Sequence, residues 1–220
     1  MSADRSVAVL ASGGVDSSIL VAHLLSQDRA VVPVYVRFGL SWEDVELVHL
    51  RKFLASLNGR RAAPLVELDI PVADVYGTHW SVTGRDIPDR ESADQAVYLP
   101  GRNLLLLAKT SVWCALNGIR TVALGTLAAN PFPDADSEFF STFSSLAGRA
   151  LGCPFEIVTP FAGRAKRDVL DLGRSLPLSL TFSCIAPVSG DHCGSCNKCA
   201  ERQRAFTDLG ITDTTEYATP

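Results

Sequence analysis

The sequence Ser12-Gly13-Gly14-Val15-Asp16-Ser17-Ser18 follows, after a single residue, the apolar run Val7-Ala8-Val9-Leu10. A short apolar run that ends near a glycine pair is typical of a buried parallel strand. Residues 17–25, behind the glycines, are apolar and long enough to form a helix. Strand, glycine-rich turn and helix make the first unit of an α/β fold.

The same alternation continues along the chain. Apolar runs and apolar periodicity predict strands at 31–36, 65–68, 121–124 and 155–158, and helices at 42–57, 103–116, 137–150, 164–174 and 197–209. This order predicts a doubly wound parallel sheet of the Rossmann-like type, which binds ligands beyond the carboxyl ends of its strands. Residues 71–98 are polar and interrupted by proline and glycine, so we expect a mobile lid or a partly disordered segment there.

The composition limits the class of protein. The 220 residues are 47% hydrophobic and 20% charged, which predicts one medium-sized domain, residues 1–180, with a small C-terminal element, residues 181–220. Collagen-like, coiled-coil and disordered chains are excluded. A net charge of −4 argues against a non-specific nucleic-acid binder. The polar start, residues 1–6, and the lack of a long apolar segment predict a cytoplasmic protein without membrane contact.

The glycine-serine loop is a predicted phosphate site. Glycines let the backbone approach an anion closely, N–H groups at a helix start point at it, and serine hydroxyls add donors. Asp16 is the one carboxylate among these donors, and it is a predicted Mg²⁺ ligand, with the cation bridging it to phosphate. The alternative is a plain strand-to-helix turn capped by Asp16. The chain contains no Gly-Lys pair, so the loop is not of the lysine-bearing type found in γ-phosphate hydrolases.

The cysteines form a second candidate site. Four of the six lie near the C-terminus: Cys184, Cys193, Cys196 and Cys199. Their two-residue gaps predict a structural Zn²⁺ site closed by four thiolates, with His192 as an alternative ligand and disulfides or an iron–sulfur cluster as alternative uses. Cys114 and Cys153 are expected to be small buried apolar residues. Arg202 and Arg204 are expected on a solvated helix face.

The loop resembles the PP-loop of the ATP pyrophosphatases, whose Ser-Gly-Gly-x-Asp-Ser pattern is met by Ser12 to Ser17. Together with the cysteine cluster, it makes the chain similar to the QueC family of the 7-deazapurine pathway. The resemblance runs from Val7 to about Phe206 and includes Tyr98 to Asn103, Lys166 with Asp168 to Gly173, Ser183-Cys184, and Cys193 to Arg202. It implies an adenine nucleotide alpha hydrolase-like fold that uses ATP, Mg²⁺ and a structural Zn²⁺.

The resemblance also implies a reaction. The family adenylates 7-carboxy-7-deazaguanine with ATP, lets ammonia displace AMP to give an amide, and uses a second ATP to convert the amide into 7-cyano-7-deazaguanine. Pre-organised cations would stabilise the charge that develops in these steps. Arg102, which opens a helix after Pro100-Gly101, and Lys166, which opens another, are the predicted catalytic cations. Simple solvent-exposed side chains are the alternative interpretation for both.

Two segments depart from the family pattern. Phe38-Gly39-Leu40-Ser41 stands where the family has Y-G-Q-R, and residues 129–139 keep only part of D-Y-S-G-Y-P-D-C-R-P-E-F. Asp134 and Glu138 are retained, and we expect them to accept hydrogen bonds from the guanidine-like edge of the substrate. The alternative is that Asp134 or Asp136 caps the helix that starts near residue 137, with Glu138 in its first turn.

These departures leave other functions open. The resemblance extends to QueC-like proteins of bacterial defence systems, which activate other carboxylates, such as the C-terminal glycine of a ubiquitin-like protein. A tRNA-modifying PP-loop enzyme fits less well, because the chain is acidic and its cysteines are placed for closed metal ligation. A nucleotide-binding sensor that forms no AMP is the non-enzymatic alternative. The family resemblance also implies a homodimer.

Overall fold

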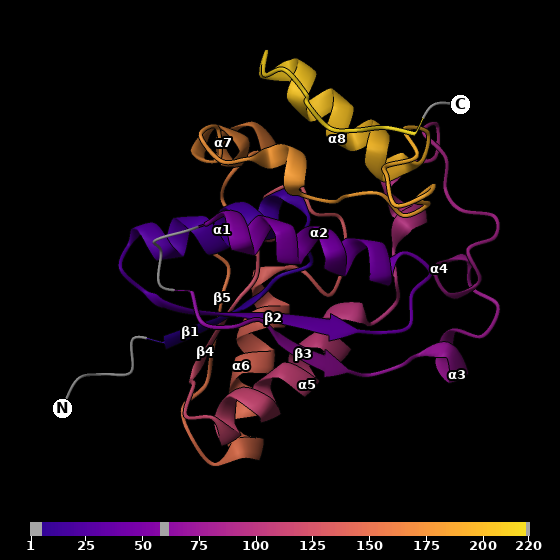
Figure 1. Cartoon of the computed structure of the whole chain (residues 1–220). Coiled ribbons are helices and arrows are strands. Elements are labelled where there is room, and N and C mark those ends of the chain that lie inside the picture. The colour runs from indigo at the N-terminus through magenta and orange to yellow at the C-terminus, as the bar shows by residue number, and fades with distance from the viewer. Residues whose placement is uncertain (1–5, 58–61, 219–220) are drawn as a thin grey trace.

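The computed structural model describes residues 6–57 and 62–218, so the polar residues 1–5 lie outside the described residues. Its strands form one five-stranded parallel sheet in the order β3-β2-β1-β4-β5 (Figure 1). The strands are β1 (Ser6–Leu10), β2 (Ala30–Arg37), β3 (Val66–Asp69), β4 (Thr121–Ala123) and β5 (Glu156–Val158). The chain runs outward from β1 to β3 and then returns to place β4 on the other side of β1, which confirms the predicted doubly wound sheet.

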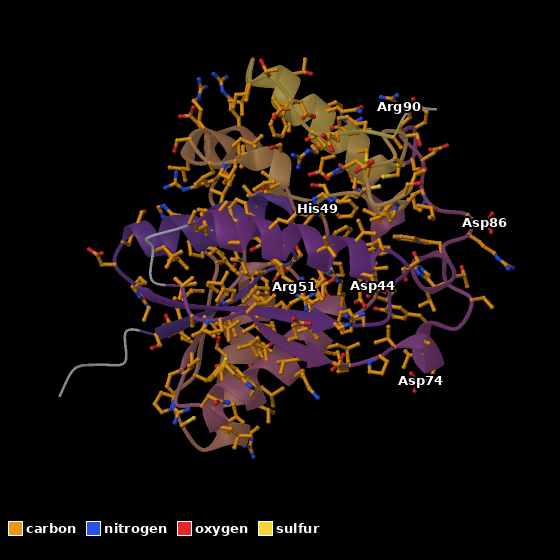
Figure 2. All side chains as sticks on the ribbon, viewed as in Figure 1. Asp44, His49, Arg51, Asp74, Asp86 and Arg90 are labelled. Carbon is orange, nitrogen blue, oxygen red and sulfur yellow. The ribbon has the colours of Figure 1, made fainter. Side chains whose placement is uncertain are left out.

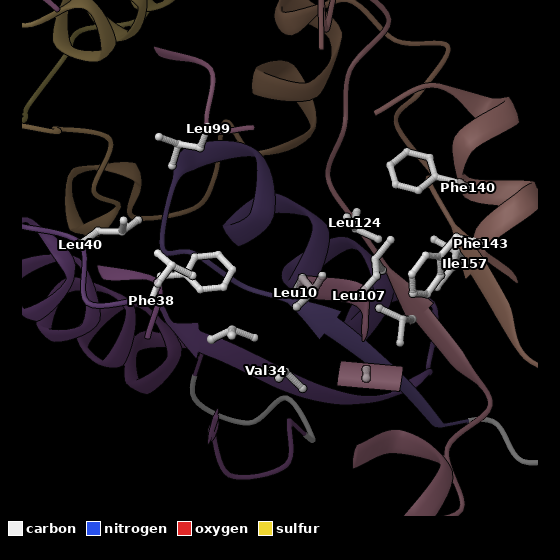
Figure 3. Packing of buried hydrophobic residues seen from close by; sticks show 14 of the residues in the cluster. Leu10, Val34, Phe38, Leu40, Leu99, Leu107, Leu124, Phe140, Phe143 and Ile157 are labelled. Atoms are coloured by element: carbon white, nitrogen blue, oxygen red, sulfur yellow. The ribbon is translucent and has the colours of Figure 1, made fainter. Parts of the chain in front are cut away.

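Helices cover both faces of the sheet (Figure 1). On one face lie α1 (Val15–Ser26), α2 (Glu43–Ser56) and α7 (Lys166–Leu172), with α8 (Asn197–Asp208) next to α7 in the outermost layer. On the other face lie α5 (Arg102–Leu116) and α6 (Ser137–Leu151). Successive residues of a strand point to opposite faces of the sheet, so the side chains of β1 contribute to two hydrophobic cores, one on each face. Val7 and Val9 pack on the α1 side, whereas Leu10 packs with Leu107 and Phe143 of α5 and α6 (Figure 3).

The segment 71–98 differs from its prediction. It contains α3 (Ala73–Tyr76), α4 (Trp80–Thr83) and the 3-10 helix η1 (Asp94–Val97), where the sequence predicted a mobile lid or a partly disordered segment. The mobile lid stays a prediction. Elements of four residues are too short to show a hydrophobic period, which is why the pattern missed them and the 3-10 helix η2 (Leu178–Leu180). Asp74 and Asp86 project outward from the segment (Figure 2), while Trp80 stacks on Trp42. Tertiary contact therefore orders the segment.

The C-terminal residues share a core with the rest of the chain. The N–H of Phe182 donates to the carbonyl of Gly13 at 2.8 Å, and Cys184 lies in the same buried cluster as Leu10 of the sheet. The division into residues 1–180 and 181–220 stays a prediction. Across residues 6–57 and 62–218, no helix combines the length and apolar character needed to cross a membrane.

The prediction that Arg202 and Arg204 lie on a solvated face of α8 was wrong for Arg202. Arg204 is exposed, but Arg202 is 2% exposed. Its guanidinium donates to the carbonyl of Leu178 at 2.7 Å and to the hydroxyl of Thr181 at 2.8 Å. These acceptors come from a distant segment that helix periodicity does not report. Cys114 is fully buried as expected, whereas Cys153 is only partly buried.

Candidate active site and metal centre

The glycine-serine loop joins β1 to α1, and its conformation requires glycine. Gly13 has a φ of +81°, and a Cβ placed there would lie 3.1 Å from the Cβ of Leu50. Gly14 is the N-cap of α1. The hydroxyl of Ser17 donates to the carbonyl of Gly14 at 3.1 Å, and the Ser12 hydroxyl accepts from the Gly14 N–H at 3.3 Å. The loop is therefore held across the start of a helix, where anions bind.

A large cavity opens beside this loop. It measures about 590 Å³ and is lined by the loop, by the carboxyl ends of β1 and β2, and by residues 124–134. A smaller cavity of about 190 Å³ adjoins it. Both are lined by the residues Ser12, Gly14, Asp16, Arg102 and Lys166. The structure thus brings the predicted phosphate loop and both predicted catalytic cations to one place.

Not every predicted loop residue faces these cavities. Ser17 lines the larger cavity and Val15 the smaller one. Ser18 is fully buried in α1, and its hydroxyl has no hydrogen-bond partner among the described residues. Gly13 contributes its carbonyl to the contact with Phe182.

Two lysines and two carboxylates meet at the mouth of the loop. The Nζ of Lys166 lies 2.7 Å from Oδ2 of Asp16 and 3.5 Å from Oε1 of Glu201, and Glu201 also pairs with Lys198. Burial opposes the charge on Lys166, but the Asp16 and Glu201 carboxylates raise its pKa above the ordinary value. Although burial opposes the charge on Glu201 as well, Lys198 and Lys166 lower its pKa to about 2. Lys166 and Glu201 are therefore both charged at neutral pH.

One carboxylate oxygen of Asp16 is not used in the ion pair with Lys166. Its Oδ1 is buried and has no hydrogen-bond partner among the described residues. A carboxylate oxygen beside a phosphate loop is the ligand that Mg²⁺ prefers, so the residue fits the predicted cation. The sequence analysis missed Lys198, which lies inside the cysteine motif, and Glu201, which lies two residues after it. Nothing in the spacing of the cysteines shows that this segment folds onto the loop.

Arg102 begins α5 and lines both cavities. Its Nε is buried and has no hydrogen-bond partner among the described residues. The same cavities are lined by Glu46 of α2, which accepts a hydrogen bond from the hydroxyl of Tyr35 at 2.7 Å. Burial raises the pKa of Glu46 to about 7. The sequence offered no signal for Glu46, since acidic residues are common on the polar face of a helix.

The two predicted substrate carboxylates lie in different surroundings. Asp134 lines the larger cavity, but its Oδ2 accepts from the N–H of Asn103 at 2.9 Å, which ties it to the first turn of α5. Glu138 is exposed in the first turn of α6 and lines neither cavity. Asp136 is the cap of α6, accepting from the N–H of Phe139 at 2.7 Å. A substrate contact by Asp134 or Glu138 stays a prediction.

The four clustered cysteines converge as a metal site requires. Their sulfur atoms all lie within 4.8 Å of one another: Cys184, Cys193, Cys196 and Cys199. The Cys184–Cys196 and Cys193–Cys199 sulfurs are 3.9 Å apart, close to the roughly 3.8 Å that a tetrahedron with Zn–S bonds of about 2.3 Å demands. Backbone N–H groups of Ala186 and Ser195 donate to the sulfurs, which stabilises thiolates.

The parallel sheet, the phosphate loop after β1 and the converging basic residues define a class, the PP-loop proteins with an adenine nucleotide alpha hydrolase-like fold. The family model described as "Queuosine biosynthesis protein QueC" matches residues 6–210. The chain belongs to the QueC family.

Individual relatives agree with this membership. The 7-cyano-7-deazaguanine synthase of Methanothermobacter thermautotrophicus is 30% identical over 97% of this chain and 99% of its own length. The synthase of Sulfolobus acidocaldarius is 29% identical over 97% of this chain, which spans about half, 48%, of that relative. The crystal structure of a predicted subunit of tRNA methyltransferase from Methanocaldococcus jannaschii matches with a TM-score of 0.50 at 16% identity, over 76% of this chain and 73% of its own. That likeness concerns the fold alone.

Proposed function

We propose that the chain is an ATP-dependent carbon–nitrogen ligase that converts 7-carboxy-7-deazaguanine and ammonia into 7-cyano-7-deazaguanine, with release of AMP and pyrophosphate. The observation that carries this proposal is the shared lining of one cavity by the PP-loop, Arg102 and Lys166 in a member of the QueC family. Relatives that match nearly the whole chain bear the name of this synthase.

The proposed reaction has two activations. A carboxylate oxygen attacks the α-phosphorus of ATP, and the bond to pyrophosphate breaks. Ammonia then attacks the acyl carbon, AMP leaves and a proton is lost, which gives the amide. The amide oxygen attacks the α-phosphorus of a second ATP, again releasing pyrophosphate. Cleavage of the carbon–oxygen bond to AMP, with loss of the remaining N–H protons, leaves the nitrile.

The chain's own residues have defined tasks in this scheme. N–H groups at the start of α1, together with the hydroxyls of Ser12 and Ser17, hold the departing pyrophosphate. Lys166 and Arg102 offset the negative charge that grows on the phosphate oxygens, and their fixed positions avoid reorganisation during the step. Asp16 holds Mg²⁺, which neutralises phosphate charge when bound. The four cysteines hold a structural Zn²⁺ that stabilises the fold without taking part in the chemistry.

A product analysis tests the proposal. The protein is incubated with ATP, Mg²⁺, ammonium and 7-carboxy-7-deazaguanine, and AMP, pyrophosphate, amide and nitrile are followed by liquid chromatography and mass spectrometry. We expect the nitrile together with AMP, and a Lys166→Met variant that forms neither. The departures at Leu40-Ser41 and at residues 129–139 favour a different acid as the second candidate. AMP release with a glycine-ended ubiquitin-like protein, and none with the deazapurine, would select it.

A further inference from the structure

One part of the lining of the smaller cavity is aromatic and aliphatic, whereas the part near the phosphate loop carries charged residues such as Lys166 and Glu201. Trp42, at the start of α2, and Trp80, in α4, stack with ring centroids 5.6 Å apart and planes 16° from parallel. Leu99 and Ile185 complete the apolar wall. A flat ring can pack on such a surface, because aromatic side chains offer large apolar contact areas.

Glu46 is a buried carboxylate that also lines this cavity. Glu46 is 8% exposed, and among the described residues no Lys, Arg or His nitrogen comes within 4.0 Å of it. One of its oxygens accepts from the Tyr35 hydroxyl, and the side chain of Trp42 also hydrogen-bonds to the carboxylate. A carboxylate has about four acceptor positions, of which these contacts occupy only a part. Burial makes its charge costly, and the Arg102 guanidinium, beyond ion-pair distance, offsets that cost in part. Glu46 therefore has acceptor capacity for a ligand with N–H donors.

The smaller cavity lies next to the predicted phosphate site. Both cavities are lined by Ser12, Gly14 and Asp16 of the phosphate loop and by Arg102. The larger cavity, about 590 Å³, lies in the range of ligand pockets of about 300–1,000 Å³ and suits a nucleotide. The smaller one, about 190 Å³, suits a single bicyclic ring. The residues that the two cavities share are those of the predicted phosphate site, so an acid in the smaller cavity would adjoin that site.

We propose that the smaller cavity is the subsite for the heterocycle of the acid substrate, with Glu46 accepting hydrogen bonds from adjacent ring and exocyclic N–H groups, and Trp42 with Trp80 packing on the ring. This inference rests on the proposed function and names the residue that selects the substrate. A carboxylate pairs with two parallel N–H donors in the same fork geometry as it does with arginine. An analogue without the exocyclic amino group leaves Glu46 with an unused acceptor, so the site rejects it.

Binding can be measured without turnover. The chain has three tryptophans, and Trp113→Phe leaves only Trp42 and Trp80 as fluorophores. In this background, 7-deazaguanine and 7-deazahypoxanthine, which lacks the amino group, are titrated by tryptophan fluorescence at about pH 8, where Glu46, with a pKa of about 7, is a carboxylate. The same titrations are made with Glu46→Gln, which keeps the size of the side chain. Asp44→Asn is the matched control, since Asp44 lies on the same helix with its side chain 87% exposed.

We expect 7-deazaguanine to bind roughly tenfold or more tightly than 7-deazahypoxanthine, and Glu46→Gln to abolish this preference. ATP affinity should change by less than about twofold in Glu46→Gln, and Asp44→Asn should behave as the parent. Equal binding of both bases by the parent, an unchanged preference in Glu46→Gln, or an equal loss of ATP affinity would each overturn the proposal. Failure of the deazapurine product assay instead overturns the proposed function, and the base titration still decides the subsite.

Discussion

The Nζ of Lys166 lies 2.7 Å from Oδ2 of Asp16, although 150 positions separate the two residues along the chain. Asp16 stands in the first turn of α1, and Lys166 is the first residue of α7. A cation at a helix N-terminus opposes the helix dipole, so it needs an anionic partner. Asp16 is that partner, and the pair aligns the start of α7 with the phosphate loop.

Lys166→Met should therefore impair chemistry more than binding. We expect kcat for AMP formation to fall by about 100-fold or more, because one pre-organised cation at a phosphoryl group contributes on that scale. Lys109→Met is the control, since Lys109 is exposed on α5 and lines neither cavity. Steady-state rates of AMP release measure both variants. A loss of less than roughly tenfold in Lys166→Met would contradict a role in the transition state.

Lys198 is expected to act as a second phosphate cation. It lies between two cysteines of the cluster, pairs with Glu201 and lines both cavities. Lys198→Met should raise the inhibition constant of pyrophosphate by about threefold to tenfold, because one charge-assisted contact is lost. Lys52→Met, on the exposed surface of α2, is the control. Equal pyrophosphate inhibition in Lys198→Met and the parent enzyme would refute the role.

The features that could be predicted from the sequence are those that depend on residues close together in the chain. The strands, the long helices and the phosphate loop follow from apolar runs, periodicity and glycine placement, which act over a few residues. The cysteine spacing likewise predicted the convergence of the four sulfurs. The surroundings of Glu46, Glu201 and Arg202 depend on how α2 and α8 pack against distant segments, and their sequence neighbourhood does not encode that contact. Asp134 shows the same limit, because its partner Asn103 lies 31 positions away.

Arg202 should contribute to the stability of the folded protein. Its guanidinium is 2% exposed, donates to Leu178, Thr181 and Thr215, and lies 4.9 Å over the ring of Phe206. Arg202→Met leaves those acceptors buried without a donor, which should lower the free energy of unfolding by about 2–4 kcal/mol. Arg204 lies two residues further along α8 and is exposed. Arg204→Met should therefore change the free energy of unfolding by less than about 0.5 kcal/mol. Urea denaturation compares the two, and equal losses would show that burial is not the cause.

Removal of the metal should unfold the C-terminal element. Cys196→Ser takes one ligand from the cluster, and we expect bound zinc to be lost and the free energy of unfolding to fall by more than about 3 kcal/mol. Cys153→Ser is the control, because this partly buried cysteine is outside the cluster. Elemental analysis and thermal unfolding are the measurements. Full zinc content in Cys196→Ser, or zinc-free parent protein of unchanged stability, would contradict a structural metal site.

The stability of the parent protein should fall with rising pH in a window set by Glu46. Burial raises the pKa of this carboxyl from 4.5 to about 7, so the folded state holds a proton there that the unfolded state has released. The free energy of unfolding therefore decreases as the pH rises from 4.5 to about 7, by on the order of 2–3 kcal/mol. Glu46→Gln cannot lose this proton, whereas the neighbouring Glu43, Tyr35 and Arg102 are common to both proteins. Urea denaturation of both proteins from about pH 5 to about pH 8 should thus give curves that diverge with pH, with the variant more stable at the alkaline end, and parallel curves would show that Glu46 is ionised throughout.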